Sequence, residues 1–236
     1  MAVTIHWLGH DAFRLQAERT VYIDPWKLPP GAPLADLILV THDHYDHCSP
    51  EDVARIRGPH TVVAAPAAAA AKLAPPVTVV QAGDQLTLNG VAVEVTPAYN
   101  LDKKFHPRQA GHVGYIVTLG GERIYHTGDS DAIPEMDHLR VDIALLPVSG
   151  VYVMTADEAA ELAGRLRPKL AIPMHYGAVA GSETDARRFV ERLVTRRVSD
   201  MPEKTCRYAL ICNERGGVID DVIVYRFEDH FLIVCN

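Results

Sequence analysis

Residues 41–48 read THDHYDHC, and this stretch places three histidines and two aspartates within a single short loop. The residues concerned are His42, Asp43, His44, Asp46 and His47. Imidazole and carboxylate are ligands that suit zinc, manganese and iron, and so dense a cluster would lose solvation if it were packed without a cation. The stretch therefore predicts a metal site, against the plainer alternative of a solvated, histidine-rich loop.

The flanking residues place this cluster at the end of a strand. Residues 37–40 (LILV) are typical of a buried strand, and Ser49-Pro50-Glu51 begins a helix directly after the cluster. In an extended or turning backbone, His42 and His44 can point the same way toward one cation. The Asp-His pair beyond the turn can then face a second cation.

Several stretches together resemble the metallo-β-lactamase superfamily. HDHYDH matches its H-x-H-x-D-H signature, and the resemblance runs from Met1 to about Val190. The further matches are WLGHDAF at 7–13, YIDPW at 22–26, IYHTGDSD at 124–131, LLPVSG at 145–150 and IPMHYG at 172–177. They look like the branch that contains L-ascorbate-6-phosphate lactonase-like metal-dependent hydrolases. The resemblance implies an α+β fold, a four-layer αββα sandwich with its ligands at strand ends.

Carried over residue by residue, the resemblance also implies a ligand set for two cations. His42 and His44 would hold the first, Asp46, His47 and His175 the second, and Asp129 would bridge both. Asp46 and Asp129 would in addition orient the nucleophile. The residues alone leave alternatives open, because T-G-D-S around Asp129 is also ordinary turn chemistry and His175 could be a capped core histidine.

One ligand expected from the resemblance is missing. Relatives place a histidine where this chain has Tyr99-Asn100, and an amide oxygen is a poor substitute for imidazole on zinc. The next loop offers His106 as the replacement, with His112 as the second choice; His106 could instead meet the substrate or cover the site. His126 is expected to orient a ligand rather than bind the metal.

Composition limits the class of protein. A chain of 236 residues with 48% hydrophobic content can bury one sizeable core. The net charge of -7 argues against nucleic-acid binding as the main role, no apolar run approaches the roughly 20 residues of a membrane span, and a cytoplasmic location is expected. Four cysteines show no CxxC pairing, and Cys48 beside the metal loop is expected to be a small buried residue rather than a soft ligand.

Residues 191–236 differ in character from the preceding 190. The stretch NERGGVIDDVIVYR at 213–226 resembles the N-terminal part of the glycine-cleavage aminomethyltransferase, the tetrahydrofolate-dependent T-protein. Three apolar strands are expected here, at 206–213, 217–227 and 230–236, and their edges invite pairing. We therefore divide the chain into a hydrolase domain (1–190) and a β-rich C-terminal appendage (191–236) that docks on the body or makes a homo-oligomer contact.

The expected activity follows from the resemblance. It is hydrolysis of a lactone, carboxylic ester or phosphoester in a small, anionic substrate by a metal-bound hydroxide, with promiscuity toward related esters. The cofactor would be two divalent cations, zinc first, with manganese or iron as alternatives. Lys103 and Lys104 could contact the anion, although a solvated face is the simpler reading. The competing hypotheses are a redox or regulatory metal module without strong hydrolysis, and folate-linked one-carbon transfer through the tail.

Overall fold

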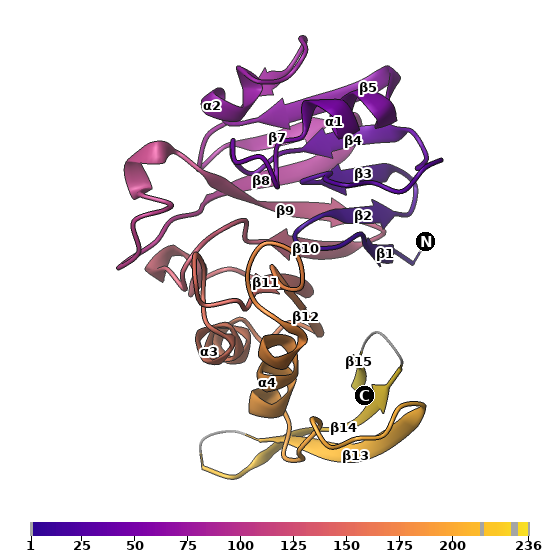
Figure 1. Cartoon of the computed structure of the whole chain (residues 1–236), viewed down its shortest axis with the longest axis vertical. Helices are drawn as coiled ribbons and strands as arrows, with labels where there is room; N and C mark the ends of the chain where they lie inside the picture. Colours follow the sequence, from indigo (N-terminus) through magenta and orange to yellow (C-terminus); the bar gives the residue numbers. More distant parts are fainter. Residues whose placement is uncertain (1, 213–214, 228–230, 236) are drawn as a thin grey trace.

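The computed structural model describes residues 2–212, 215–227 and 231–235, and it consists of two six-stranded sheets, a three-stranded sheet and helices packed against them. Figure 1 shows the two large sheets in the upper and middle parts of the molecule and the small sheet, drawn in yellow, at the opposite end. The two large sheets come from the two halves of the first 175 residues, in the order of the chain.

The first large sheet contains strands in sequence order, antiparallel from β1 to β3 and parallel from β3 to β6. Its strands are β1 (Thr4–Trp7), β2 (Phe13–Gln16), β3 (Thr20–Ile23), β4 (Ala35–Leu39), β5 (Arg57–Ala65) and β6 (Thr78–Val79). Helix α1 (Pro50–Ile56) follows the histidine-rich loop, and Ser49 caps it by accepting the Asp52 N–H. The proline in the first helical turn fits this start, because its missing N–H would have no partner there.

The second large sheet has the order β12-β11-β10-β9-β8-β7, antiparallel from β7 to β10 and parallel from β10 to β12. Its strands are β7 (Gln85–Leu88), β8 (Val91–Pro97), β9 (Val113–Leu119), β10 (Glu122–His126), β11 (Ile143–Pro147) and β12 (Leu170–Met174). The dipeptide Asn89-Gly90 predicts a hairpin turn, and such a turn joins β7 to β8, with both residues at positive φ. A turn of this kind matches the twist of the strands it joins.

Strand β4 shows how the sequence builds the layers. Leu37 and Leu39 belong to the buried cluster between the two large sheets, whereas Ile38 belongs to the cluster beneath α1. A strand that is buried on both faces needs apolar residues at successive positions, which explains the run LILV. The outer face of the second sheet is covered by α3 (Ala156–Leu166) and α4 (Glu183–Leu193). The four-layer αββα sandwich predicted from the sequence is therefore confirmed.

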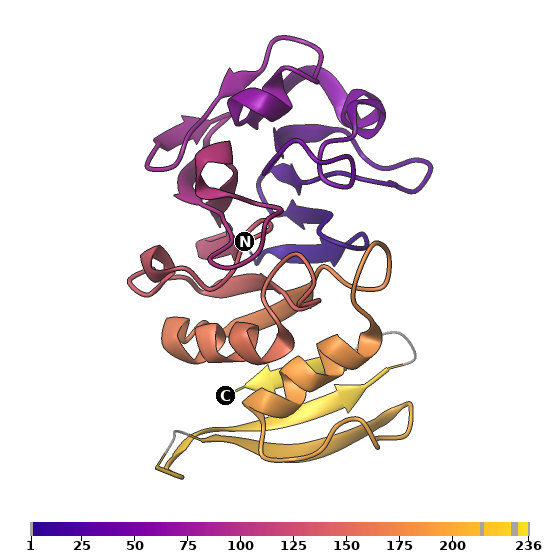
Figure 2. The same cartoon turned by 60° about the vertical axis from the view of Figure 1, so that its left-hand side comes forward.

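The C-terminal appendage adds a further layer on α3 and α4. It is formed by β13 (Thr205–Cys212), β14 (Val218–Arg226) and β15 (Phe231–Cys235), all antiparallel. Figure 2 shows both helices lying between these strands and the body. Val222 and Val224 share one buried cluster with Phe189 and Val190 of α4. Of the three strands predicted in this region, Asn213, His230 and Asn236 lie outside the described residues.

Two helical sequence patterns have different outcomes in the structure. Residues 155–158 (TADE) are typical of a capping box, and the box is present, since Thr155 accepts the Glu158 N–H and Glu158 accepts the Thr155 N–H. The alanine-rich stretch at 66–74 predicts a helix over its whole length, and this is wrong, because α2 covers only Ala67–Ala70. The two prolines at 75–76 cannot continue a helix, and small alanine side chains bury too little surface to extend it. None of the helices in the described part of the chain has the length and apolar character of a membrane span.

Candidate metal centre

Side chains from five separate segments meet where strands of the two large sheets end. The loop after β4 supplies residues 42–47, the loop after β10 supplies Asp129, and the end of β12 supplies His175. The turn between β1 and β2 adds His10 and Asp11, and the loop after β8 adds His106. A rigid sheet fixes each of these positions, which favours a site of defined geometry.

The first group contains His42, His44, His106 and Asp129. His44 Nδ1 lies 3.0 Å from His42 Nε2 and 3.3 Å from His106 Nε2. Asp129 Oδ2 lies 3.3 Å from His106 Nε2 and 3.9 Å from His42 Nε2. Three imidazole nitrogens and one carboxylate oxygen thus surround a common point.

Hydrogen bonds on the far side of the His42 and His106 rings leave their Nε2 atoms without protons. The Thr41 hydroxyl donates to Asp24, so the same oxygen accepts from His42 Nδ1 at 2.9 Å. His106 Nδ1 lies 3.2 Å from Asn100 Oδ1 and 3.1 Å from the Tyr152 carbonyl, and both oxygens can only accept. Each Nε2 therefore presents a lone pair to the centre of the group, as a metal ligand must.

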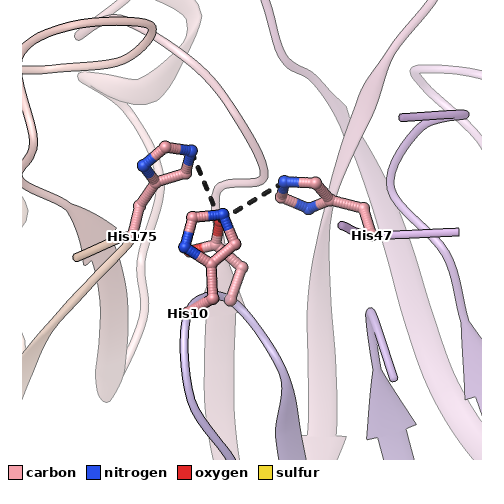
Figure 3. A group of neighbouring side chains, drawn as sticks. His10, His47 and His175 are labelled. Atoms are coloured by element: carbon pink, nitrogen blue, oxygen red, sulfur yellow. Dashed lines mark ion pairs between the residues drawn. The ribbon is translucent and has the colours of Figure 1, made fainter. Parts of the chain in front are cut away.

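The second group contains His10, Asp11, His47 and His175. Figure 3 shows the rings of His47 and His175 approaching from opposite sides toward His10. His47 Nδ1 lies 2.8 Å from Asp24, and His175 Nδ1 lies 2.9 Å from the Ser149 hydroxyl. Both rings are held from behind, and their Nε2 atoms face the group.

Asp129 connects the two groups. Its Oδ1 lies 3.4 Å from His47 Nε2, and its Oδ2 lies 3.2 Å from His175 Nε2 and 3.3 Å from His106 Nε2. A single carboxylate therefore contacts histidines of both groups, which is the arrangement of a bridging ligand between two cations.

The arrangement fits divalent cations. Five buried atoms of these side chains have no hydrogen-bond partner among the described residues: His10 Nδ1, both carboxylate oxygens of Asp11, His47 Nε2 and Asp129 Oδ1. Buried polar atoms are normally paired, so a set of orphaned acceptors that face one another fits a cation-binding site. Tetrahedral ligands bound to zinc at about 2.0–2.1 Å lie about 3.4 Å from one another. The spacings of 3.0–3.9 Å in both groups bracket that value.

The two groups differ in electrostatics. Burial, together with the charge of His47, holds the pKa of His42 well below its ordinary value, and burial also lowers the pKa of His106. Burial lowers the pKa of His175 as well, but the carboxylates of Asp129 and Asp11 outweigh it and raise this pKa to about 9. The carboxylates of Asp129 and Asp24 likewise outweigh burial at His47 and raise its pKa well above the ordinary value. The carboxylate-rich second group therefore has the greater affinity for positive charge.

A cavity of about 720 Å³ lies elsewhere, between β1, β12 and α4. Its lining is mainly apolar, and the two groups of histidines and aspartates contribute none of the described residues that line it. The stacked rings of Trp7 and Tyr176, 4.9 Å apart, line it. It is separate from the centre that carries the chemistry.

Comparison with known proteins identifies the family. The model of the beta-lactamase superfamily domain matches residues 4–175. The chain belongs to this superfamily. A UPF0173 metal-dependent hydrolase of Thermoplasma acidophilum is 35% identical over 205 residues, which cover 78% of this chain and 88% of the relative. A relative of the same description from Methanoculleus marisnigri is 33% identical and covers 82% and 91%.

Solved structures of the superfamily agree in fold. A structure from Parabacteroides distasonis, named for a metal-dependent hydrolase, has a TM-score of 0.74 and 34% identity over 81% of this chain and 88% of that one. Igni18, a metallo hydrolase from Ignicoccus hospitalis, has a TM-score of 0.64 and 25% identity over 80% and 90%. Residues 174–236 match the GCVT N-terminal domain, so the aminomethyltransferase resemblance extends back to the end of β12.

The structure brings together five of the six ligands predicted from the sequence, and also His106. The five are His42, His44, His47, Asp129 and His175. Asp46 lies at the edge: its Oδ2 is 3.1 Å from His10 Nε2 and 3.8 Å from His47 Nε2. Its ligand role stays a prediction.

Three neighbouring side chains lie outside both groups. His112 stacks on His42 at 4.8 Å between ring centroids, and burial with the charges of nearby histidines lowers its pKa to about 4. The thiol of Cys48 points toward the Ala69 carbonyl and packs beneath α1, as a small buried residue does. His126 Nε2 donates to the Asp11 carbonyl at 2.9 Å, and its expected role in orienting a ligand stays a prediction.

The ligand set predicted from the sequence does not include His10 or Asp11. The available signal was a histidine and an aspartate directly after Gly9 at the end of a strand, in a turn where both Gly9 and His10 have positive φ. The same pairing of histidine and aspartate at a strand end marks the loop at 42–47.

Proposed function

We propose that the protein is a hydrolase that uses two divalent cations to cleave an ester-like bond. The observation that supports this most directly is the position of Asp129, whose carboxylate contacts histidines of two adjacent groups, each able to hold a cation. When bound, a pair of divalent cations acidifies a water and polarises the bond under attack. Zinc is the first choice, with manganese or iron as alternatives.

The residues around the cations would perform three tasks. Asp24 and Asn100 fix the rings of His47 and His106, so that the ligands need not reorganise during the reaction. Asp129 sets the separation of the two positions. Asp46, fixed by His10 at 3.1 Å, would accept a hydrogen bond from the attacking water and so orient it.

Two pairs of aromatic residues connect the site to the surface. Trp26 contacts the His10 ring at 5.6 Å and the Tyr45 ring at 6.0 Å between centroids. Tyr152 contacts Phe105 at 4.5 Å and lies 6.5 Å from His175. Tyr45 and Phe105 are 67% and 52% exposed, so each pair runs from a ring near the site to a ring at the surface. We infer that the substrate carries an apolar or aromatic group next to the bond that is cleaved.

Fixed positive charge at the rim is limited. Lys103 is only 17% exposed, with its ammonium 2.6 Å from Asp131, and Lys72 lies 2.7 Å from Asp43. Both ammonium groups are neutralised by these partners. Of the two lysines in the loop after β8, Lys103 and Lys104, the second has an exposed side chain. A lactone or carboxylic ester therefore fits the site better than a multiply charged phosphoester.

The proposal is tested by an activity panel with metal removal. Lactones, aryl carboxylic esters and phosphoesters would be offered to the chelator-treated protein and to the same protein reloaded with Zn²⁺ or Mn²⁺. We expect hydrolysis of at least one ester class to disappear on chelation and to return on reloading. His47→Ala or Asp129→Ala should lower metal content and turnover by orders of magnitude, whereas exposed His138→Ala should change neither. Activity that survives complete metal removal would contradict the proposal.

A further inference from the structure

The turn between β1 and β2 holds Asp11 rigidly at the candidate metal centre. The turn is closed by two backbone bonds, from the Leu8 N–H to the Ala12 carbonyl at 2.8 Å and from the Ala12 N–H to the Gly9 carbonyl at 3.0 Å. His126 Nε2 donates to the Asp11 carbonyl at 2.9 Å, since a carbonyl can only accept. The Asp11 side chain therefore projects from a backbone that is fixed on both sides.

The neighbouring carbonyl is held just as firmly. The His10 carbonyl accepts from the Trp7 indole at 2.9 Å and from the His175 N–H at 3.2 Å. The second of these bonds ties the turn directly to the end of β12, which carries one of the imidazoles of the second group. Asp11 and His175 are thus set relative to one another by the backbone and not only by side-chain packing.

The Asp11 carboxylate has the environment expected of a metal ligand. It is 0% exposed, and neither of its oxygens has a hydrogen-bond partner among the described residues. Its Oδ2 lies 3.5 Å from His47 Nε2 and 3.9 Å from His175 Nε2. A buried carboxylate without hydrogen bonds is strongly unfavourable unless a cation compensates its charge.

Its geometry compares well with that of Asp46, the aspartate expected in this position. Asp46 Oδ2 lies 3.8 Å from His47 Nε2 and is hydrogen-bonded to His10. Asp11 Oδ2 lies nearer to His47 and also contacts His175. A cation that is bound by both imidazoles would therefore meet Asp11 before it met Asp46.

We propose that Asp11 is a direct ligand of the cation in the second group, alongside His47, His175 and Asp129. This inference rests on the proposed metal site but not on any particular substrate. It makes the two positions chemically unequal. Three imidazoles and one carboxylate would hold the first cation, and His47, His175, Asp11 and Asp129 would hold the second, while His10 of the second group is bonded to Asp46. Carboxylate oxygens favour manganese and other hard cations more than imidazole does, so the second position should accept Mn²⁺ readily.

The experiment compares the full-length chain with Asp11→Asn, and with Asp11→Ser as a second neutral variant. Each protein is stripped with chelator, titrated with Mn²⁺ or Zn²⁺, and analysed for bound metal by mass spectrometry and for melting temperature. We expect the wild type to bind two cations and the variants about one. Loss of a ligand should weaken the second position by more than the roughly 10- to 100-fold caused by loss of an outer partner. The Mn²⁺ to Zn²⁺ affinity ratio should fall in Asp11→Ser.

Melting temperature separates a ligand from a merely structural residue. Removal of an uncompensated buried carboxylate should leave the metal-free melting temperature unchanged or raise it, while the rise on metal addition should shrink. Asp52→Asn is the matched control, because Asp52 is also buried but accepts the N–H groups of Lys27 and Leu28 and pairs with Arg55. Asp52→Asn should lower the metal-free melting temperature and leave metal content unchanged.

Each possible outcome either overturns or supports the assignment of Asp11 as a ligand. Two cations bound with wild-type affinity by Asp11→Asn and Asp11→Ser would overturn the inference, as would a lower metal-free melting temperature with full metal content. Loss of one cation in the variants would support it, even if the wild type loaded with two cations hydrolysed nothing in the ester panel. That last result would refute the proposed function alone.

Discussion

Replacing Asp24 by asparagine should weaken metal binding at both positions, although Asp24 itself contacts neither. Its carboxylate accepts three hydrogen bonds: from the Thr41 N–H at 2.7 Å, from the Thr41 hydroxyl at 2.6 Å, and from His47 Nδ1 at 2.8 Å. The Thr41 hydroxyl in turn accepts from His42 Nδ1. One buried carboxylate therefore sets the ring orientation and the protonated nitrogen of a histidine in each group.

The size of the effect follows from these contacts. Asparagine keeps one acceptor oxygen and replaces the other with an amide that donates, so it opposes at least one of the three donors. Loss of an outer partner of a ligating histidine costs about 10- to 100-fold in metal affinity, or about 1.4 to 2.8 kcal/mol. A buried donor left without its acceptor costs about 1–3 kcal/mol of folding stability.

The assay is competition with a chromophoric chelator for Zn²⁺, combined with urea unfolding of the metal-free protein. Asp36→Asn is the control, because Asp36 accepts the Thr20 N–H at 2.8 Å on the same sheet but belongs to neither group of ligands. It should leave Zn²⁺ affinity unchanged. If Asp24→Asn bound Zn²⁺ within twofold of wild type, the assignment of His47 and His42 as ligands oriented by Asp24 would be refuted.

Three further predictions address other parts of the structure. His106→Ala should lose about one bound cation in metal analysis, whereas His112→Ala, which removes a ring outside both groups, should keep both; equal retention would exclude His106 as a ligand. Phe189→Ala should lower the free energy of unfolding, measured in urea, by about 3–5 kcal/mol and leave metal content unchanged, because this ring is fully buried between the helices and the C-terminal appendage. A loss below about 1 kcal/mol would mean that the buried cluster around Phe189 is loosely packed. Burial and the charge of Asp24 raise the pKa of the Cys48 thiol from 9.0 to about 11, and the residue is 3% exposed. Iodoacetamide at pH 8 should therefore label exposed Cys206 and spare Cys48. Rapid labelling of Cys48, measured by peptide mass spectrometry, would contradict its burial.

Single elements of the fold could be predicted from local signals, whereas the four-layer sandwich was predicted from the resemblance to the metallo-β-lactamase superfamily. The run LILV at 37–40 indicates a buried strand, and Asn89-Gly90 and Gly120-Gly121 indicate hairpin turns. The ligands of the 42–47 loop were accessible for the same reason, since they are adjacent in the chain. The appendage was predicted as strands, but its packing against α3 and α4 depends on Val222 and Phe189 meeting across distant segments. Whether it also mediates oligomer formation stays a prediction.

Asp11 could not be predicted in the same way, because its role depends on tertiary contacts alone. Nothing in WLGHDAF indicates that the His10 carbonyl will accept the His175 N–H, and this bond is what brings the turn to the end of β12. Without it, a histidine and an aspartate after a glycine are ordinary turn residues. The missing information is the pairing between two strand ends that are more than 160 positions apart.

Asn100 shows how the sequence pattern can be correct and its interpretation incomplete. The asparagine stands where the resemblance to the superfamily implies a histidine, and the sequence predicts a weaker site unless His106 of the next loop supplies the missing ligand. In the structure, the side-chain oxygen of Asn100 accepts the backbone N–H of His106 at 3.1 Å and lies 3.2 Å from His106 Nδ1. The side-chain amide of Asn100 donates to the Tyr152 carbonyl at 2.9 Å. These bonds fold the loop back so that His106 Nε2 lies 3.3 Å from His44 Nδ1. Asn100 therefore holds the imidazole of His106, six residues later in the chain, at the first group. Asn100→Ala should release His106 from this group even though Asn100 is not itself a ligand.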